Sequence, residues 1–270
     1  MDQREQLRKA QLYIANEIKR VCEKNGIKYF LDCGSMLGAV RHHGFIPWDD
    51  DMDIGMKKED YEHFLRIATC ELGDEFFLDN YQSNTDNALV FSKVRLKNTT
   101  YIEAKGNPNA VHNEIFVDVF PYYYIADNDL IRRLEGTFMS ILSQAIMSKS
   151  GYKVWKGEGV LKRLKFLPTD IVGALLSKQK MHSIIDYLYN KHTNTRRMCI
   201  HSGSCYGYWF FPKDVFADFI EVGFERYNFK IPSRYDEYLS IAYGDYMKLP
   251  PRENQATHLI CKLDMGPYSF

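Results

Sequence analysis

A short stretch, residues 30–56, constrains most strongly what this chain can fold into. It reads FLDCGSMLGAVRHHGFIPWDDDMDIGM: an apolar segment, a Gly-Ser pair, a basic segment and a group of aspartates. From Asp51 to Ile54, acidic and apolar side chains alternate. In a strand this alternation places Asp51 and Asp53 on one face and Met52 and Ile54 in the core. We therefore expect a rigid strand over 52–56 that presents two carboxylates to one site.

Two neighbouring carboxylates repel each other, and a hard divalent cation such as Mg²⁺, or Mn²⁺, relieves that repulsion. Gly34 and Ser35 end the preceding apolar segment and stand before a predicted helix over 36–42. Backbone N–H groups and a hydroxyl at such a position bind phosphate. Together these features indicate phosphoryl or nucleotidyl transfer. The alternative interpretation is a solvated acidic turn followed by a helix cap.

The run from Gly34 to Ile54 resembles the signature of the LicD family, which belongs to the nucleotidyltransferase superfamily and includes the fukutin-like proteins. The superfamily pattern is Gly-Ser, a spacer, and then Asp-apolar-Asp-apolar. The resemblance resumes at FVDVFP, residues 116–121, and at YGDYMKLPP, residues 243–251, whereas residues 130–206 match weakly. It implies an α+β fold with a nucleotidyltransferase-like mixed β-sheet flanked by helices and a mainly helical second half.

The organisation that we expect has three parts. Residues 1–125 form the nucleotidyltransferase-like catalytic core, residues 126–205 a mainly helical insertion or subdomain, and residues 206–270 a C-terminal segment that completes the active-site cleft. Hydrophobic periodicity predicts helices over 3–24, 36–42, 58–69, 128–149, 160–193 with a break at 167–168, and 232–242. Strands are predicted over 27–31, 52–56, 75–81, 88–97, 100–104 and 115–120, with a hairpin over 220–231.

A third acid, Asp118, lies within the apolar strand over 115–120, which we expect Pro121 to stop. An acid in such a strand is costly unless a metal or a turn binds it. The resemblance implies that it is the third metal carboxylate. We thus predict Asp51, Asp53 and Asp118 as the catalytic and metal-binding residues. Asp49 and Asp50 rank lower, as caps or outer residues, because only Asp51 and Asp53 alternate with two buried apolar positions.

Donor phosphates also need cationic partners. Arg41 follows the predicted short helix and is suited to a diphosphate, Lys93 and Arg95 share one strand face, and the tail after residue 246 is basic. For each of these the alternative is a solvated surface charge. The predicted substrate-binding residues are Gly34, Ser35, Arg41, Lys93, Arg95, Tyr246, Lys248 and Arg252.

The resemblance also implies the substrates. LicD-like proteins transfer phosphocholine or a related phospho-alcohol from CDP-choline or another CDP-alcohol to a glycan or lipid-linked saccharide, such as a lipopolysaccharide or teichoic acid precursor, and release CMP. Choline would favour an aromatic cage, and the candidates are Tyr122, Tyr123, Tyr124, Trp155, Trp209 and Tyr246. Two alternatives are NMP transfer from an NTP and a non-catalytic glycan-binding protein. With 35 basic and 35 acidic residues, the chain lacks the field that nucleic-acid binding favours.

Cysteine spacing and the distribution of apolar and basic residues give expectations for the cellular compartment, for membrane contact and for zinc binding. No CxxC pair, no signal-like N-terminus and no long apolar run indicate a cytoplasmic protein. The resemblance, through its membrane-linked precursors, implies a place at the inner face of the membrane. The basic stretch from Lys149 to Lys165 suits peripheral contact with an anionic membrane, although a solvated helix face is the alternative. His192, Cys199, His201 and Cys205 lie close in sequence, but their spacing fits no standard zinc finger.

Overall fold

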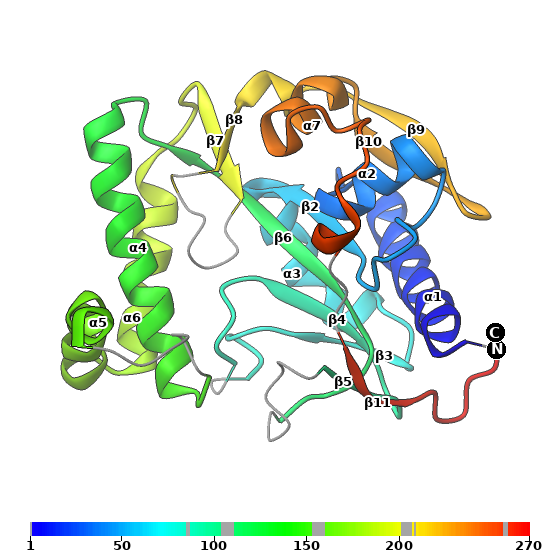
Figure 1. Cartoon of the computed structure of the whole chain (residues 1–270), viewed down its shortest axis with the longest axis horizontal. Coiled ribbons are helices and arrows are strands. Elements are labelled where there is room, and N and C mark those ends of the chain that lie inside the picture. Colours follow the sequence, from blue (N-terminus) through cyan, green and yellow to red (C-terminus); the bar gives the residue numbers. More distant parts are fainter. Residues whose placement is uncertain are drawn as a thin grey trace. The chain divides into compact units, whose positions relative to one another are not determined.

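The computed structural model describes residues 2–84, 87–103, 111–152, 160–200, 207, 209–255 and 259–270. For residues 160–165 it describes the helical backbone but not the side chains. The chain has the predicted α+β architecture (Figure 1). It divides into two compact units. The first comprises residues 1–79, 93–121 and 214–270, and the second comprises 80–92 and 122–213. The predicted three-part boundaries stay a prediction.

The first unit contains the long helix α1 (Gln3–Lys24), α2 (Cys33–His42), α3 (Lys58–Glu71) and α7 (Tyr235–Tyr243). Its main strands are β1 (Phe30–Leu31), β2 (Asp53–Lys57), β3 (Phe76–Asp79), β4 (Ser92–Leu96) and the first half of β6 (Phe116–Ile125), in the order β1-β2-β6-β4-β3. β1 pairs antiparallel with β2, with Leu31 opposite Ile54. The hydrophobic repeat of α1 is buried as predicted, with Leu7, Ile14 and Val21 fully enclosed.

Two smaller strand pairs complete this unit. The predicted hairpin is present as β9 (Phe219–Phe224) and β10 (Tyr227–Pro232), joined through Glu225, whose φ is 53°. β5 (Thr100–Glu103) pairs antiparallel with β11 (Ile260–Asp264), a strand that the sequence did not indicate. Two short 3₁₀ turns, η1 (Lys213–Phe216) and η2 (Arg252–Asn254), flank the C-terminal elements.

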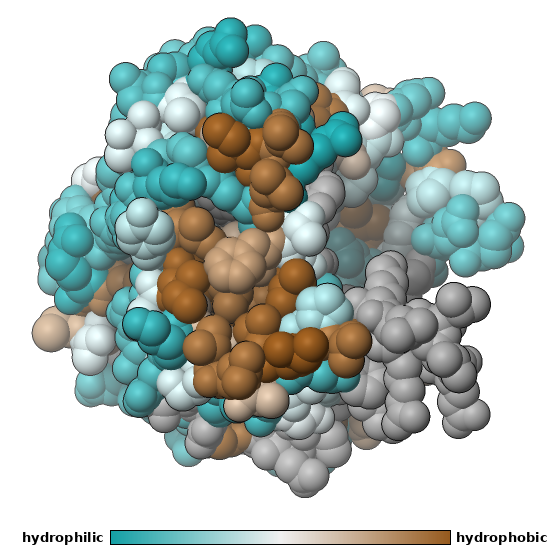
Figure 2. All heavy atoms as spheres, turned by 90° about the vertical axis from the view of Figure 1, so that its left-hand side faces the viewer, coloured by the Kyte–Doolittle hydropathy of each residue, from teal (hydrophilic) through white to brown (hydrophobic). Residues whose placement is uncertain are grey.

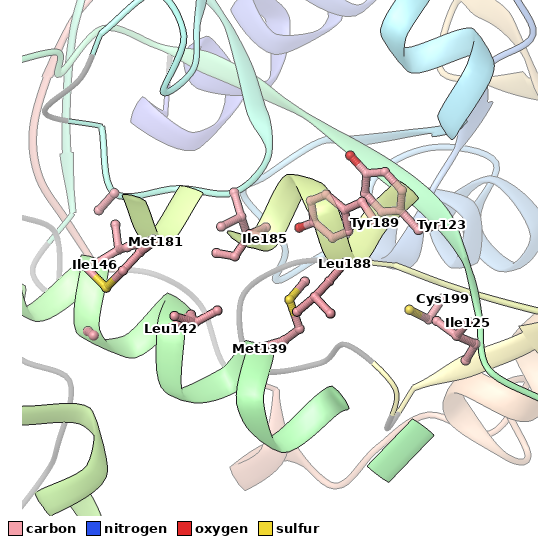
Figure 3. Packing of buried hydrophobic residues seen from close by; sticks show 13 residues of the cluster. Tyr123, Ile125, Met139, Leu142, Ile146, Met181, Ile185, Leu188, Tyr189 and Cys199 are labelled. Carbon is pink, nitrogen blue, oxygen red and sulfur yellow. The ribbon is translucent and has the colours of Figure 1, made fainter. Parts of the chain in front are cut away.

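The second unit is mainly helical. It contains α4 (Asp129–Lys149), α5 (Val160–Leu175) and α6 (Lys178–Lys191), together with β7 (Arg197–Ile200) and β8 (Phe210–Pro212). Residues 122–125 of β6 pair with β7, which pairs with β8. The core of this unit lies between α4, α6 and these strands, and Figure 3 shows Met139 and Leu142 of α4 directed toward Ile185 and Leu188 of α6. Tyr123 and Tyr189 stack with ring centroids 3.6 Å apart.

Several predicted boundaries were wrong for physical reasons. Pro121 does not stop β6, because the next residues, from Tyr122 to Ile125, pair in register with β7 and carry the strand onward. α5 runs through Pro168, and the break comes at Ser177, whose hydroxyl accepts from the Lys180 N–H and begins α6. Pro232 ends β10 instead of starting α7.

The basic stretch that we expected to face a membrane falls mostly outside the described residues. Lys149 is described, and its Nζ donates to the carbonyls of Gly173 at 2.6 Å and Leu176 at 3.2 Å near the end of α5. Lys149 therefore satisfies helix-end carbonyls. Lys153, Lys156 and the side chains of Lys162, Arg163 and Lys165 are not described. In the described parts of the chain, we find no helix that combines the length and the apolar character needed to span a bilayer.

The four His and Cys residues whose spacing fits no standard zinc finger are likewise only partly described. His192 Nε2 lies 2.8 Å from Glu135 Oε2, and Cys199 is enclosed in the core of the second unit. His201 and Cys205 lie outside the described residues. A zinc site at these four residues stays untested.

One buried histidine gives the fold a dependence on pH. His182 of α6 is 5% exposed and stacks on Tyr81 at a centroid distance of 4.2 Å. Burial, and next the charge of Lys178, lower the pKa of His182 from 6.5 to about 4. The unfolded chain therefore binds this proton at a higher pH than the folded chain.

We expect the free energy of unfolding to fall as the pH drops from about 6.5 to about 4, by up to about 3 kcal/mol from this residue alone. His182→Phe, which keeps an aromatic ring beside Tyr81, should show a smaller fall. Urea unfolding at about pH 7 and about pH 5 measures the difference. Equal falls for both proteins would contradict this origin of the pH dependence.

Candidate active site

Backbone hydrogen bonds join the three sequence segments that carry the predicted acids. The N–H of Asp53 donates to Ser35 Oγ at 2.9 Å, and its carbonyl accepts from the N–H of Asp32 at 3.0 Å. The N–H of Asp118 donates to the Met52 carbonyl at 3.1 Å, which fixes β6 beside the start of β2. The Gly-Ser pair, the Asp-x-Asp segment and Asp118 therefore form one connected region.

The position of the Gly-Ser pair differs from the expectation. Gly34 and Ser35 lie inside the first turn of α2, which begins at Cys33. Asp32 is the N-cap, and its carboxylate accepts from the Cys33 N–H at 2.9 Å and from the Tyr238 hydroxyl at 2.6 Å. The helix begins earlier than predicted because Asp32 supplies this cap. Ser35 is buried with its oxygen bonded to β2, so it ties α2 to the acidic strand.

The carboxyl group of Asp53 lies in an unusually negative environment. Burial raises the pKa of Asp53 well above its ordinary value, and the charges of Asp51, Asp118, Asp32 and Asp49 add to this effect in that order. The side chain is 8% exposed. A concentration of carboxylates around a buried acid is unfavourable without a cation. This electrostatic arrangement fits a divalent ion with oxygen ligands.

A cavity of about 410 Å³ opens beside these acids. Its walls combine four acids, two cationic residues and three aromatic residues. These are Asp49, Asp51, Asp53, Asp245, Arg41, Lys248, Trp48, Tyr243 and Tyr246, and Gly34, Leu37, Ile46, Pro250 and Asn254 complete the lining. Acids for a metal, cations for phosphate and aromatic faces for an organic group thus surround one space.

A Mg²⁺ ion fits the donor set of this cavity. Asp51 and Asp53 both line it and both offer carboxylate oxygens. Among the described residues, no three His, Cys, Asp or Glu side chains are arranged to enclose a metal ion by themselves. Mg²⁺ commonly uses one or two protein carboxylates and takes its other ligands from water and substrate phosphates, so two acids suffice.

Asp118, the third predicted ligand, has a cationic partner. Lys93 Nζ donates to Asp118 Oδ1 at 2.5 Å and lies 3.3 Å from the centroid of the Phe116 ring. Burial lowers the pKa of Lys93, while the charge of Asp118 acts in the opposite direction. Asp118 is close enough to raise the pKa of Asp53, but it is not part of the cavity lining. Its role as a metal ligand stays a prediction.

Some of the predicted substrate-binding residues line the cavity, and others lie away from it. Arg41, Tyr246 and Lys248 line the cavity, and Arg41 Nη1 donates to the Tyr246 carbonyl at 2.6 Å. Arg95 is buried and donates to Asp79 at 2.6 Å and to the Glu114 carbonyl at 3.0 Å.

Arg252 is exposed in η2 and does not line the cavity. Of the aromatic candidates for a choline cage that the structure describes, Tyr246 alone lines the cavity, while Tyr123 stacks on Tyr189 and Tyr122 packs on Phe211 in the second unit. Trp155 lies outside the described residues.

Two features of the site escaped the sequence reading. Asp49, ranked low before, lines the cavity, and its Oδ2 is so close to Gly34 that a Cβ at residue 34 would lie 2.7 Å from it. The spacing of two from Asp49 to Asp51 to Asp53 was a usable signal. Asp50 points elsewhere: it is buried and accepts from the Tyr101 hydroxyl at 3.4 Å.

The second missed feature is the anchoring of the acidic loop by α1. Arg8 donates from Nη2 to the carbonyls of Ile46 at 2.7 Å and Asp49 at 2.6 Å, and Gln11 Nε2 donates to the Asp50 carbonyl at 2.8 Å. These contacts cross about forty residues of sequence, and nothing in the periodicity of α1 indicates them. Arg8 therefore positions the loop that carries the acids.

Arg8→Gln should lower the free energy of unfolding by about 2 kcal/mol, because it removes several charge-assisted hydrogen bonds to loop carbonyls. It should also speed amide hydrogen exchange over residues 46–51. Arg4→Gln is the matched control, since Arg4 makes a single contact of 3.5 Å with the Pro47 carbonyl. Equal effects of the two substitutions would show that Arg8 does not fix the loop.

Asp53→Asn should raise the free energy of unfolding in EDTA by about 1 kcal/mol, because it removes one charge from a group of like charges. The same substitution should weaken Mg²⁺ binding, followed by calorimetry. Asp245→Asn is the control: Asp245 lines the same cavity but is not among the four carboxylates that act most strongly on Asp53. A loss of stability in Asp53→Asn would argue against electrostatic repulsion at this site.

Comparison with known proteins agrees with this geometry. Residues 26–139 match the model described as the LicD/FKTN/FKRP nucleotidyltransferase domain. This is the class that the helix-flanked sheet and its acidic cavity indicate. A lipopolysaccharide cholinephosphotransferase LicD of Haemophilus influenzae is 30% identical over 268 residues, covering 92% of this chain and 93% of that protein. The chain belongs to the LicD family.

More distant relatives share a shorter region. Human ribitol 5-phosphate transferase FKRP is 31% identical over 109 residues, which cover 40% of this chain and 19% of that protein. An uncharacterized protein of Rickettsia prowazekii is 32% identical over 118 residues, covering 44% of this chain and 42% of that protein. The similarity to human FKRP thus concerns a limited part of both chains.

Proposed function

We propose that this protein is a metal-dependent transferase that moves phosphocholine, or a related phospho-alcohol, from a CDP-linked donor to a hydroxyl of a cell-surface glycan or teichoic acid precursor and releases CMP. The main support is the cavity that Asp51 and Asp53 line together with Arg41 and Lys248. A relative that covers nearly the whole chain and is named a cholinephosphotransferase supports the nature of the group transferred.

Asp51 and Asp53 would hold Mg²⁺, or Mn²⁺, and Asp118 would join them in the role that we predict for it. The ion, when bound, neutralises charge on the leaving nucleotide. Arg41 and Lys248, which line the same cavity, bind the donor phosphates, and the first turn of α2 at Gly34 adds backbone N–H groups. The proton of the attacking hydroxyl passes to an acid of this group, and a carboxylate held weakly by metal is the better base.

The remaining predicted ligands have more limited parts in this proposal. Lys93 balances the charge of Asp118 and thereby sets how strongly that acid attracts a cation. Arg95 supports β4 through Asp79, and Arg252 approaches the donor only if the tail closes over the cavity. Trp48, Tyr243 and Tyr246 offer aromatic faces to the alcohol or the base, and aromatic faces are what a quaternary ammonium prefers.

A second candidate is NMP transfer from an NTP, which the nucleotidyltransferase description of the matching domain favours. The same acids and cations would serve that reaction. The two activities differ in their products, because NMP transfer releases pyrophosphate, whereas phospho-alcohol transfer from a CDP donor releases CMP.

Incubation with CDP-choline, Mg²⁺ and a glycan acceptor should release CMP and add phosphocholine, and EDTA should abolish the release. CDP-ethanolamine, CDP-glycerol and CDP-ribitol are tested in parallel, with CMP quantified by chromatography and the product by mass spectrometry. Asp51→Asn and Asp53→Asn should each lower kcat by about a thousandfold or more, since both remove transition-state charge stabilisation.

Glu59→Gln, an exposed change in α3, is the matched control and should keep full activity. No turnover with any CDP donor, together with pyrophosphate release from an NTP, would establish the second candidate instead. Donor binding that is equally tight with and without Mg²⁺, and no turnover, would indicate the glycan-binding alternative.

A further inference from the structure

The outer side of α4 carries large apolar side chains in contact with solvent. Leu130, Leu134 and Phe138 are spaced four residues apart and share one face of the helix. They are 68%, 62% and 41% exposed, and the neighbouring Ile131 is 44% exposed. The opposite side of α4 packs into the core of the second unit (Figure 3). α4 is therefore apolar on two sides, and the described residues cover one of them.

The neighbouring helix α5 continues this pattern. Leu167, Ile171 and Leu175 again follow at intervals of four and are 48%, 48% and 76% exposed. α5 packs closely on α4, since a Cβ at Gly173 would lie only 3.8 Å from Ala145. Figure 2 shows hydrophobic surface gathered on the side of the molecule that carries these two helices, with hydrophilic surface to its left and above it. We call the exposed residues of both helices the apolar face.

The charge of this part of the chain is positive. Residues 128–191 contain eleven lysines and arginines but five aspartates and glutamates, whereas the whole chain has 35 of each kind. Arg133 is exposed directly beside Leu134. The sequence also places Lys162, Arg163 and Lys165 in the first turns of α5. An apolar face within a basic segment suits an anionic partner.

Most of the acids in this segment are already neutralised or bonded. Asp129 accepts from Arg197 at 2.6 Å and from Arg132 at 3.0 Å. Glu135 is buried, and it accepts from Lys191 at 2.6 Å and lies 2.8 Å from the ring of His192. Asp170 of α5 is an exposed acid close to the apolar face. The sequence of this segment is therefore net positive, and Arg133 is a described cation exposed beside the apolar residues of α4.

We propose that the apolar face of α4 and α5 docks on an anionic lipid surface, with its leucines inserted at the headgroup boundary and its basic residues bound to the headgroups. A lipid surface is favoured over a second copy of the chain, because two copies would bring two net-positive segments together. This inference is independent of which group the active site transfers.

The experiment uses the full chain and sedimentation with vesicles of phosphatidylcholine, alone or mixed with phosphatidylglycerol. The wild type should partition onto the mixed vesicles, and added salt should weaken the binding. The double variant Leu134→Gln/Leu175→Gln should lower the partition coefficient at least about tenfold, because it removes two exposed leucines from the inserted surface. Circular dichroism and urea unfolding confirm that the variant is folded.

Leu259→Gln is the matched control: Leu259 is 71% exposed but lies in the first unit, so its removal should leave vesicle binding unchanged. Arg133→Glu should weaken binding to the mixed vesicles without changing binding to pure phosphatidylcholine. The proposal would be overturned if the wild type binds mixed vesicles no better than pure phosphatidylcholine vesicles. It would also be overturned if the double variant binds mixed vesicles as well as the wild type does. Conversion of a dimer to a monomer by the double variant, with vesicle binding unchanged, would assign the face to a second copy.

Discussion

Electrostatic repulsion among carboxylates is the constraint on which the site depends. Asp53 is enclosed and surrounded by the charges of Asp51, Asp118, Asp32 and Asp49, so the folded chain holds acids together that would separate in water. They stay together because rigid backbone holds them: the N–H of Asp53 is fixed by Ser35, and its carbonyl is fixed by Asp32. Folding therefore holds the carboxylates together at a cost in electrostatic free energy, and a bound cation would offset that cost.

The second unit shows a different use of amphipathic structure. One side of α4 meets α6 and the strands through Met139 and Leu142, and this side gives the unit its core. The other side presents leucines to solvent beside basic residues. One side of α4 thus packs in the core and the other side contacts solvent. The hydrophobic periodicity of its sequence would not by itself distinguish the two sides.

The sequence was sufficient for the parts of the fold governed by local periodicity. The bounds of α1 and α3 and the β9–β10 hairpin agree closely with the pattern, because apolar spacing and turn residues act within a few positions. Prediction from the sequence failed where contacts between residues far apart in the chain determine the structure. The pairing of β5 with β11 and the continuation of β6 through Pro121 depend on strands far away in sequence. The site follows the same rule. The sequence indicated Asp51 and Asp53, but it did not indicate the hydrogen bonds by which Arg8 holds the acidic loop.

The close approach of Asp49 to Gly34 has a consequence for the family's chemistry. A Cβ at residue 34 would lie 2.7 Å from Asp49 Oδ2, closer than such atoms approach, whereas no backbone atom of the acidic loop lies within 4 Å of it. A methyl group at this corner would therefore displace the carboxylate of Asp49 by a change of side-chain torsion and leave the loop in place. Glycine at position 34 thus lets one more acid stand against the first turn of α2 at the edge of the cavity.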